Sequence, residues 1–154
     1  MKLLLLSLLA AAPCAGQFVS MEFRFEGIGC ASCMESLPER MKRLRGVESA
    51  TVDAEHGTLK LRLAVANRVR IEQVRDMIEQ DGTKATSAEV EVKGELARED
   101  GKWILKPAGG SARYEILGDA AAAGTCLLTG TVERLRPETG DLVIRAREIH
   151  QAER

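Results

Sequence analysis

The spacing of apolar residues changes repeatedly between residues 19 and 92, and this change constrains the fold more than any other feature. A period of two predicts strands at residues 21–25, 47–52, 59–63 and 88–92. Steps of three and four predict helices at residues 34–44 and 71–78. The order strand, helix, strand, strand, helix, strand is that of the split βαβ, ferredoxin-like arrangement, so we expect an α+β sandwich over residues 18–93.

The ends of both predicted helices carry recognisable residues. Gly46 and Gly82 are suited to the positions just after the helices, and Asn67 can cap the start of the second helix. Pro38 lies inside the first helix, where it lacks an N–H group. Residues 36–39 also read as a capping box, which would start that helix late, but the apolar register favours a kinked helix that passes through the proline.

The region from residue 94 to residue 150 shows no helical period. It reads as five short strands, at residues 95–99, 102–106, 112–117, 125–134 and 142–149. Asp100-Gly101 is a hairpin signal between the first two. We therefore expect a second, small all-β domain at residues 94–150, an OB-like barrel on strand count. It shows no catalytic constellation, so we predict that the protein is not an enzyme.

Residues 1–16 have the pattern of a secretory signal peptide. A positive start precedes the apolar run Leu3–Ala12, which is too short to span a bilayer, and small residues follow. A lipid anchor at Cys14 is the rival interpretation, but Ala11 and Pro13 do not fit the usual lipobox. We expect an exported, periplasmic protein whose mature chain has no membrane span.

Composition argues against nucleic acid as a partner. The formal net charge is −1, so no bulk positive field attracts a polyanion. Aromatic residues make up 3% of the chain, too few for stacking platforms.

Cys30 and Cys33 lie where the first strand ends and the first helix begins. The N-terminal end of a helix stabilises thiolates, and thiolates bind soft metal ions. Two sulfurs with no neighbouring histidine or carboxylate suit Cu(I) or Hg(II), whereas Zn(II), a further alternative, prefers four ligands. A thiol–disulfide redox pair and a degenerate site in an interaction module remain open.

On these residues the chain resembles the heavy-metal-associated domain family, which includes copper metallochaperones and the periplasmic mercury-binding protein. The resemblance covers residues 20–92, and the family motif Gly-Met-x-Cys-x-x-Cys falls on Gly27, Ile28, Gly29, Cys30 and Cys33. It implies that the two cysteines are the metal ligands and that Ile28 is an apolar anchor in place of methionine.

The resemblance extends to the loop after the second helix. Related proteins have Lys, Tyr or Phe near the metal directly after the glycine that corresponds to Gly82. This chain has Thr83 there, and Lys84 follows as a supporting residue of the site loop.

Arg40, Lys42 and Arg43 make one side of the first helix basic. A solvated face is the ordinary interpretation, and a docking face for an acidic partner is the functional one. The resemblance implies a partner that transports or accepts metal through exposed thiols, with transfer by ligand exchange.

Other potential ligands have ordinary interpretations. We expect Cys126, Met34 and Trp103 in the core, and His56 and His150 on the surface.

Overall fold

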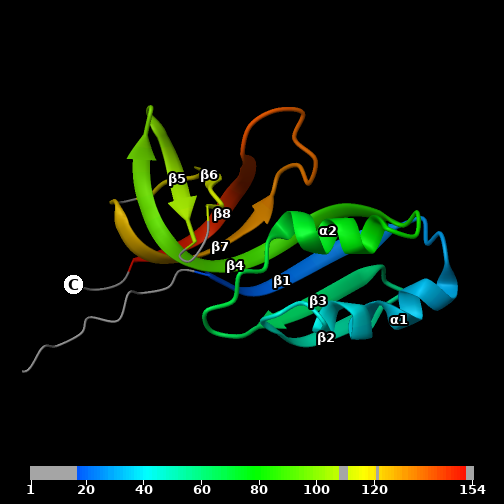
Figure 1. Cartoon of the computed structure of the whole chain (residues 1–154). Coiled ribbons are helices and arrows are strands. Elements are labelled where there is room, and N and C mark those ends of the chain that lie inside the picture. Colours follow the sequence, from blue (N-terminus) through cyan, green and yellow to red (C-terminus); the bar gives the residue numbers. More distant parts are fainter. Residues whose placement is uncertain (1–16, 108–110, 121, 152–154) are drawn as a thin grey trace, which may run out of the picture.

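A computed structural model describes residues 17–107, 111–120 and 122–151 (Figure 1). The predicted signal peptide, with Cys14, lies outside the described residues. Within these described residues, two helices and eight strands follow one another. They are β1 (Gln17–Glu26), α1 (Ala31–Lys42), β2 (Val47–Asp53), β3 (Thr58–Leu63), α2 (Ile71–Glu79), β4 (Lys84–Glu99), β5 (Lys102–Lys106), β6 (Tyr114–Leu117), β7 (Gly124–Val132) and β8 (Leu142–Gln151).

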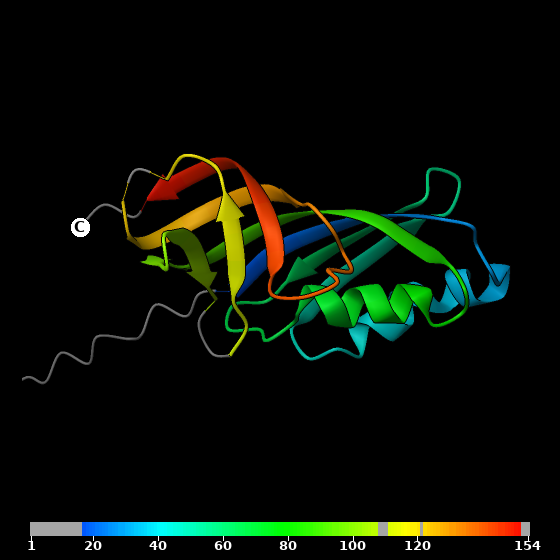
Figure 2. The same cartoon turned by 90° about the horizontal axis from the view of Figure 1, so that it is seen from above.

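The first part is an antiparallel sheet in the order β2-β3-β1-β4, with both helices on one of its faces (Figures 1 and 2). Met21, Phe23 and Phe25 of β1 point into the core, and the intervening residues do not. The helices bury the residues whose spacing predicted them: Met34, Leu37 and Met41 on α1, and Ile71, Val74 and Ile78 on α2. The predicted element order is confirmed.

The helix ends agree only in part with the prediction. The first helix starts at Ala31 and continues through Pro38, as the apolar register indicated. The predicted cap at Asn67 is wrong, because the second helix begins at Ile71. Asn67 is buried, its amide donates to the carbonyl of Phe18, and its side-chain oxygen accepts the N–H of Val69, so it closes a turn ahead of the helix.

The sixteen-residue strand β4 belongs to both parts of the molecule. One of its edges pairs with β1 as far as Lys93 and with β5 from Glu95 onward. The change of partner falls at Gly94, where a Cβ atom would lie 2.9 Å from the carbonyl oxygen of Lys106. The predicted boundary between residues 93 and 94 therefore falls inside a continuous strand, and residues 95–99 extend the preceding strand instead of forming a new one.

The other edge of β4 pairs with β7, and this pairing closes a ring. The ring runs β4-β5-β6-β8-β7 and back to β4, with β6 and β8 parallel and the remaining neighbours antiparallel. Together with the first part it makes one eight-stranded sheet, so the fold is α+β with a large sheet.

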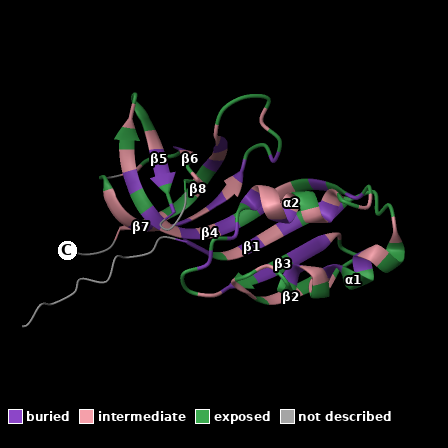
Figure 3. Cartoon of the chain, viewed as in Figure 1, coloured by how far each residue is buried: buried purple, intermediate pink, exposed green. Residues whose placement is uncertain are grey.

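One hydrophobic cluster runs through both parts (Figure 3). The rings of Phe18 and Tyr114 meet edge to face across the junction, with centroids 5.5 Å apart. Cys126 is fully buried, as predicted, while Trp103 is partly buried and packs at the edge of the cluster. Within the described residues neither α1, with 12 residues, nor α2, with 9, has the length and apolar character of a membrane-crossing helix.

Candidate metal site

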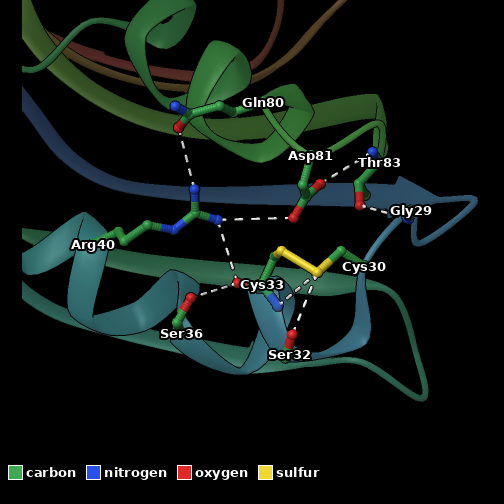
Figure 4. Close-up of a disulfide and its surroundings, with 9 residues drawn as sticks. All are labelled: Gly29, Cys30, Ser32, Cys33, Ser36, Arg40, Gln80, Asp81 and Thr83. Atoms are coloured by element: carbon green, nitrogen blue, oxygen red, sulfur yellow. Dashed lines mark hydrogen bonds and ion pairs between the residues drawn. A yellow bond between two sulfur atoms is a disulfide. The ribbon is translucent and has the colours of Figure 1, made fainter.

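The cysteine pair lies at the tip of the first part, where the chain turns from β1 into α1 (Figures 1 and 4). Cys30 is the N-cap residue of α1, and its sulfur accepts the backbone N–H of Cys33 at 3.2 Å. The hydroxyl of Ser32 lies 3.4 Å from the same sulfur. These contacts place Cys30 Sγ at the positive end of the helix dipole, which favours a thiolate there.

Cys30 and Cys33 are joined in a disulfide, with Cα atoms 5.2 Å apart. Both residues are half-buried, and Gly27, Ile28 and Gly29 before them are exposed. A reductant can therefore reach the pair and release two thiols that already face each other.

A second loop, between α2 and β4, packs against the first. The hydroxyl of Thr83 accepts the N–H of Gly29 at 3.3 Å, and Thr83 donates its own N–H to the carboxylate of Asp81 at 3.2 Å. A Cβ atom on Gly29 would lie 2.2 Å from the carbonyl oxygen of Asp81, so glycine is required for this close approach. The loop between α2 and β4 thus holds the cysteine-bearing turn in place.

The side chain of Arg40 joins α1 to the end of α2 (Figure 4). Its guanidinium donates to the backbone carbonyl of Cys33 at 3.3 Å and to the side-chain oxygen of Gln80 at 3.2 Å. It also faces the carboxylate of Asp81 at 3.8 Å. A cation is therefore fixed within the turn that carries the second cysteine.

Comparison with known proteins identifies this part of the chain. The profile of the heavy-metal-associated domain family matches residues 22–84. Residues 22–84 are a heavy-metal-associated domain. The match runs from the middle of β1 to the first residue of β4, so the ring lies almost wholly beyond it. No curated protein matches the chain significantly.

Several solved structures align with a little under half of this chain. The CopZ metallochaperone is 25% identical over 44% of this chain and 98% of its own, with a TM-score of 0.38. The N-terminal domain of a potential copper-translocating P-type ATPase from Bacillus subtilis, in its Cu(I)-loaded state, is 22% identical over 45% and 85%, with a TM-score of 0.39. A copper binding domain from HMA7, a P-type ATPase, is 24% identical over 46% and 90%, with a TM-score of 0.37.

Two supporting residues predicted for the heavy-metal-associated domain lie differently from expectation. Ile28 is 40% exposed at the tip, so it does not anchor the loop in the core. Lys84 is the first residue of β4 and pairs with Glu26, and its side chain makes no hydrogen bond or ion pair within the described residues. Successive side chains of an extended segment point to opposite faces. Thr83 is buried, so the side chain of the next residue, Lys84, points away from the core.

The three basic residues of the predicted docking face on α1 do not share one surface. Arg40 turns toward the loop after α2, as described above, while Arg43 is exposed. Lys42 forms an ion pair with Glu39 at 3.0 Å on the surface.

Sequence reasoning missed Asp81 and Gln80 and did not single out Arg40 within its basic run. The available signal was the position of Gln80 and Asp81 just before Gly82 and Thr83, because the family resemblance places the residue after that glycine near the metal.

Metal donors other than the cysteine pair are scarce at the tip. The described residues contain no group of three or more His, Cys, Asp or Glu side chains that could hold an ion. His56 pairs with Asp53 in the turn between β2 and β3, and His150 pairs with Glu148 on β8. Met34 is buried in the core. The donor set at the tip is thus two sulfurs.

Proposed function

We propose that this is an exported, non-enzymatic protein that binds one Cu(I) ion between the reduced thiolates of Cys30 and Cys33. It buffers the ion or passes it to a metal-transporting or metal-accepting protein with exposed thiols. The observation that carries the proposal is the accessible cysteine pair at the N-terminal end of α1, in a heavy-metal-associated domain.

The two-sulfur donor set favours a soft ion of low coordination number. Thiolates select Cu(I) over harder ions, and Cu(I) and Hg(II) accept two ligands. Zn(II) in structural sites takes four, which the described residues do not gather. Cu(I) is therefore the cargo that we propose first and Hg(II) the second.

Binding requires reduction of the disulfide. Two thiols of a reductant such as glutathione convert the Cys30–Cys33 disulfide to two thiols, and the reductant leaves as its own disulfide. The ion then displaces the thiol protons. Transfer proceeds when a partner's thiolate enters the coordination sphere and replaces one cysteine at a time, so no net redox change occurs.

The decisive experiment measures Cu(I) binding by the reduced chain from Gln17 onward in competition with a chelator. We expect one ion, lost in Cys30→Ser/Cys33→Ser and kept in Cys126→Ser, the matched control at a buried sulfur. If the wild-type protein binds no more ion than the double variant, the proposal is wrong.

A thiol–disulfide redox protein is the second candidate, and the disulfide itself favours it. Such a protein would reduce or oxidise mixed disulfides of a substrate through Cys30 and Cys33. Turnover of a glutathionylated peptide by the metal-free protein, without tight Cu(I) binding, would establish this function in place of the first.

For the ring, we infer an OB-like barrel from its strand order and from the single parallel pair, β6 with β8. A groove of about 710 Å³ on its surface is lined by six carboxylates and three basic side chains. The six are Glu99, Asp100, Glu115, Glu133, Glu138 and Asp141. This excess of negative charge disfavours a polyanion, in agreement with the proposal that nucleic acid is not a partner.

A further inference from the structure

Arg40 and Asp81 form a charged pair directly behind the cysteine turn. The Arg40 side chain is 23% exposed and the Asp81 side chain 8% exposed. Asp81 comes from the loop after α2 and Arg40 from the third turn of α1, so the pair bridges the two segments that frame the site (Figure 4).

The pair is held by charge more than by direct hydrogen bonding. The two facing atoms, Arg40 Nη2 and Asp81 Oδ2, are 3.8 Å apart, and Asp81 Oδ2 is buried without a hydrogen-bond partner within the described residues. A buried carboxylate needs a nearby cation, because desolvation of a lone charge is unfavourable. Arg40 is that cation.

The same guanidinium also binds the backbone of a cysteine. Arg40 Nη2 donates to the carbonyl oxygen of Cys33, which accepts the hydroxyl of Ser36 as well, at 2.9 Å. Arg40 thus sets the position of the first turn of α1 relative to the loop after α2. Lys84, which the sequence placed near the site, has no such contact.

We propose that Arg40 is a positioning residue of the cysteine pair and the cation that offsets its negative charge, with the Asp81 carboxylate partly neutralising that cation. This inference rests on the proposed function for its metal-binding consequence. Reduction and Cu(I) binding put negative charge on the two sulfurs, since a Cu(I) ion held by two thiolates carries a net charge of −1. A guanidinium in a partly buried turn stabilises that charge more than an exposed lysine does.

A metal-free measurement tests the electrostatic part. The equilibrium between disulfide and dithiol is set with glutathione at fixed pH, where two glutathione molecules become one glutathione disulfide for each protein disulfide reduced. We expect Arg40→Met to shift this equilibrium about tenfold toward the disulfide, which corresponds to a potential lower by about 30 mV. Asp81→Asn is expected to shift it the other way, by about threefold.

Three further variants separate charge from structure. Arg40→Lys keeps the charge but not the forked contacts to Cys33 and Gln80, so it is expected to lie between the wild type and Arg40→Met. Arg43→Met removes an exposed charge from the same helix and is expected to change nothing. The double variant Arg40→Met/Asp81→Asn is expected to lie between its two single variants.

Cu(I) competition tests the consequence for the cargo. We expect Arg40→Met to bind Cu(I) about tenfold more weakly, and Asp81→Asn to bind at least as tightly as the wild type. Shifts of the same sign in Arg40→Met and Asp81→Asn, or equal behaviour of Arg40→Met and Arg43→Met, would overturn the proposal. If Arg40→Met does not fold by circular dichroism, Asp81→Asn and Arg40→Lys still decide it. Failure of the wild type to bind Cu(I) would refute the proposed function alone, because the glutathione equilibrium needs no metal.

Discussion

The cysteine tip and the five-stranded ring place their sulfurs in opposite ways. At the tip, Cys30 and Cys33 are half-buried behind an exposed loop. In the ring, Cys126 is fully buried. The charged side chains of the ring pair with one another, as Lys102 does with Glu115 at 2.8 Å. Reactive sulfur is thus available at one end of the molecule, while the other end keeps its cysteine inside the core.

Two glycines make this comparison testable, and the largest effect is expected at the tip. Gly29→Ala would place a Cβ atom 2.2 Å from the carbonyl oxygen of Asp81. The two loops must then separate, so we expect Cu(I) affinity to fall about 10–100-fold, as for other changes around a metal's ligands. Chelator competition measures it.

Gly94→Ala is the counterpart in the shared strand. Its Cβ atom would lie 2.9 Å from the carbonyl oxygen of Lys106. Here we expect a loss of unfolding free energy of about 1–3 kcal/mol, measured in urea, with Cu(I) affinity unchanged. A large loss of affinity in Gly94→Ala would show that the two ends are not separable.

Cys126→Ser should lower stability without touching the site. The serine hydroxyl would enter an apolar core, so we expect a loss of about 1–3 kcal/mol in the unfolding free energy. The number of Cu(I) ions bound should stay at one. Loss of the bound ion in this variant would contradict the assignment of function to the tip.

Arg75→Met examines the contact between α2 and the segment that leads to β8. Arg75 is 12% exposed and donates to the carbonyl oxygen of Leu135. Removing this hydrogen bond should cost about 0.5–1.5 kcal/mol and speed amide hydrogen exchange at residues 135–142. Arg68→Met, on an exposed side chain, is the control. Equal exchange in the two variants would mean that this contact does not hold the segment.

The smallest effect is expected at alkaline pH. Burial raises the pKa of the Cys126 thiol, and the charge of Glu95 adds to this. The unfolded chain loses this proton first, near pH 8.5, so stability should fall as the pH rises above that value. Urea midpoints of the oxidised protein between pH 8 and 9.5 measure the slope. Cys126→Val should flatten it, and an unchanged slope would assign the effect to other groups.

The fold of the first part was predictable because each of its elements has a strong period. The alternation in β1 and the three-and-four spacing in α1 leave few alternatives, and Pro38 did not outweigh that register. The start of α2 was missed because an asparagine side chain can close a turn as readily as it caps a helix. The sequence predicted separate strands at residues 88–92 and 95–99, since sequence alone does not show that one strand can continue and change its partner.

The candidate site was predictable only as far as its ligands. The two cysteines, spaced three residues apart after a strand, are enough to predict a two-sulfur metal site. Arg40 resembles Lys42 and Arg43 in sequence, and only the packing of α1 against the end of α2 shows which of them faces inward. Lys84 was predicted near the site but points elsewhere, because the direction of its side chain depends on the register of β4, which the sequence does not show.

The continuity of β4 has a consequence for anyone who wishes to study the heavy-metal-associated domain alone. A fragment that ends at residue 93 would lose β7, which pairs with β4 from Ala88 onward, and would expose a row of unpaired backbone N–H and C=O groups along that strand. Such open edges template the association of chains. Such a fragment would therefore tend to self-associate, and a protease would find no linker between the two parts at which to separate them.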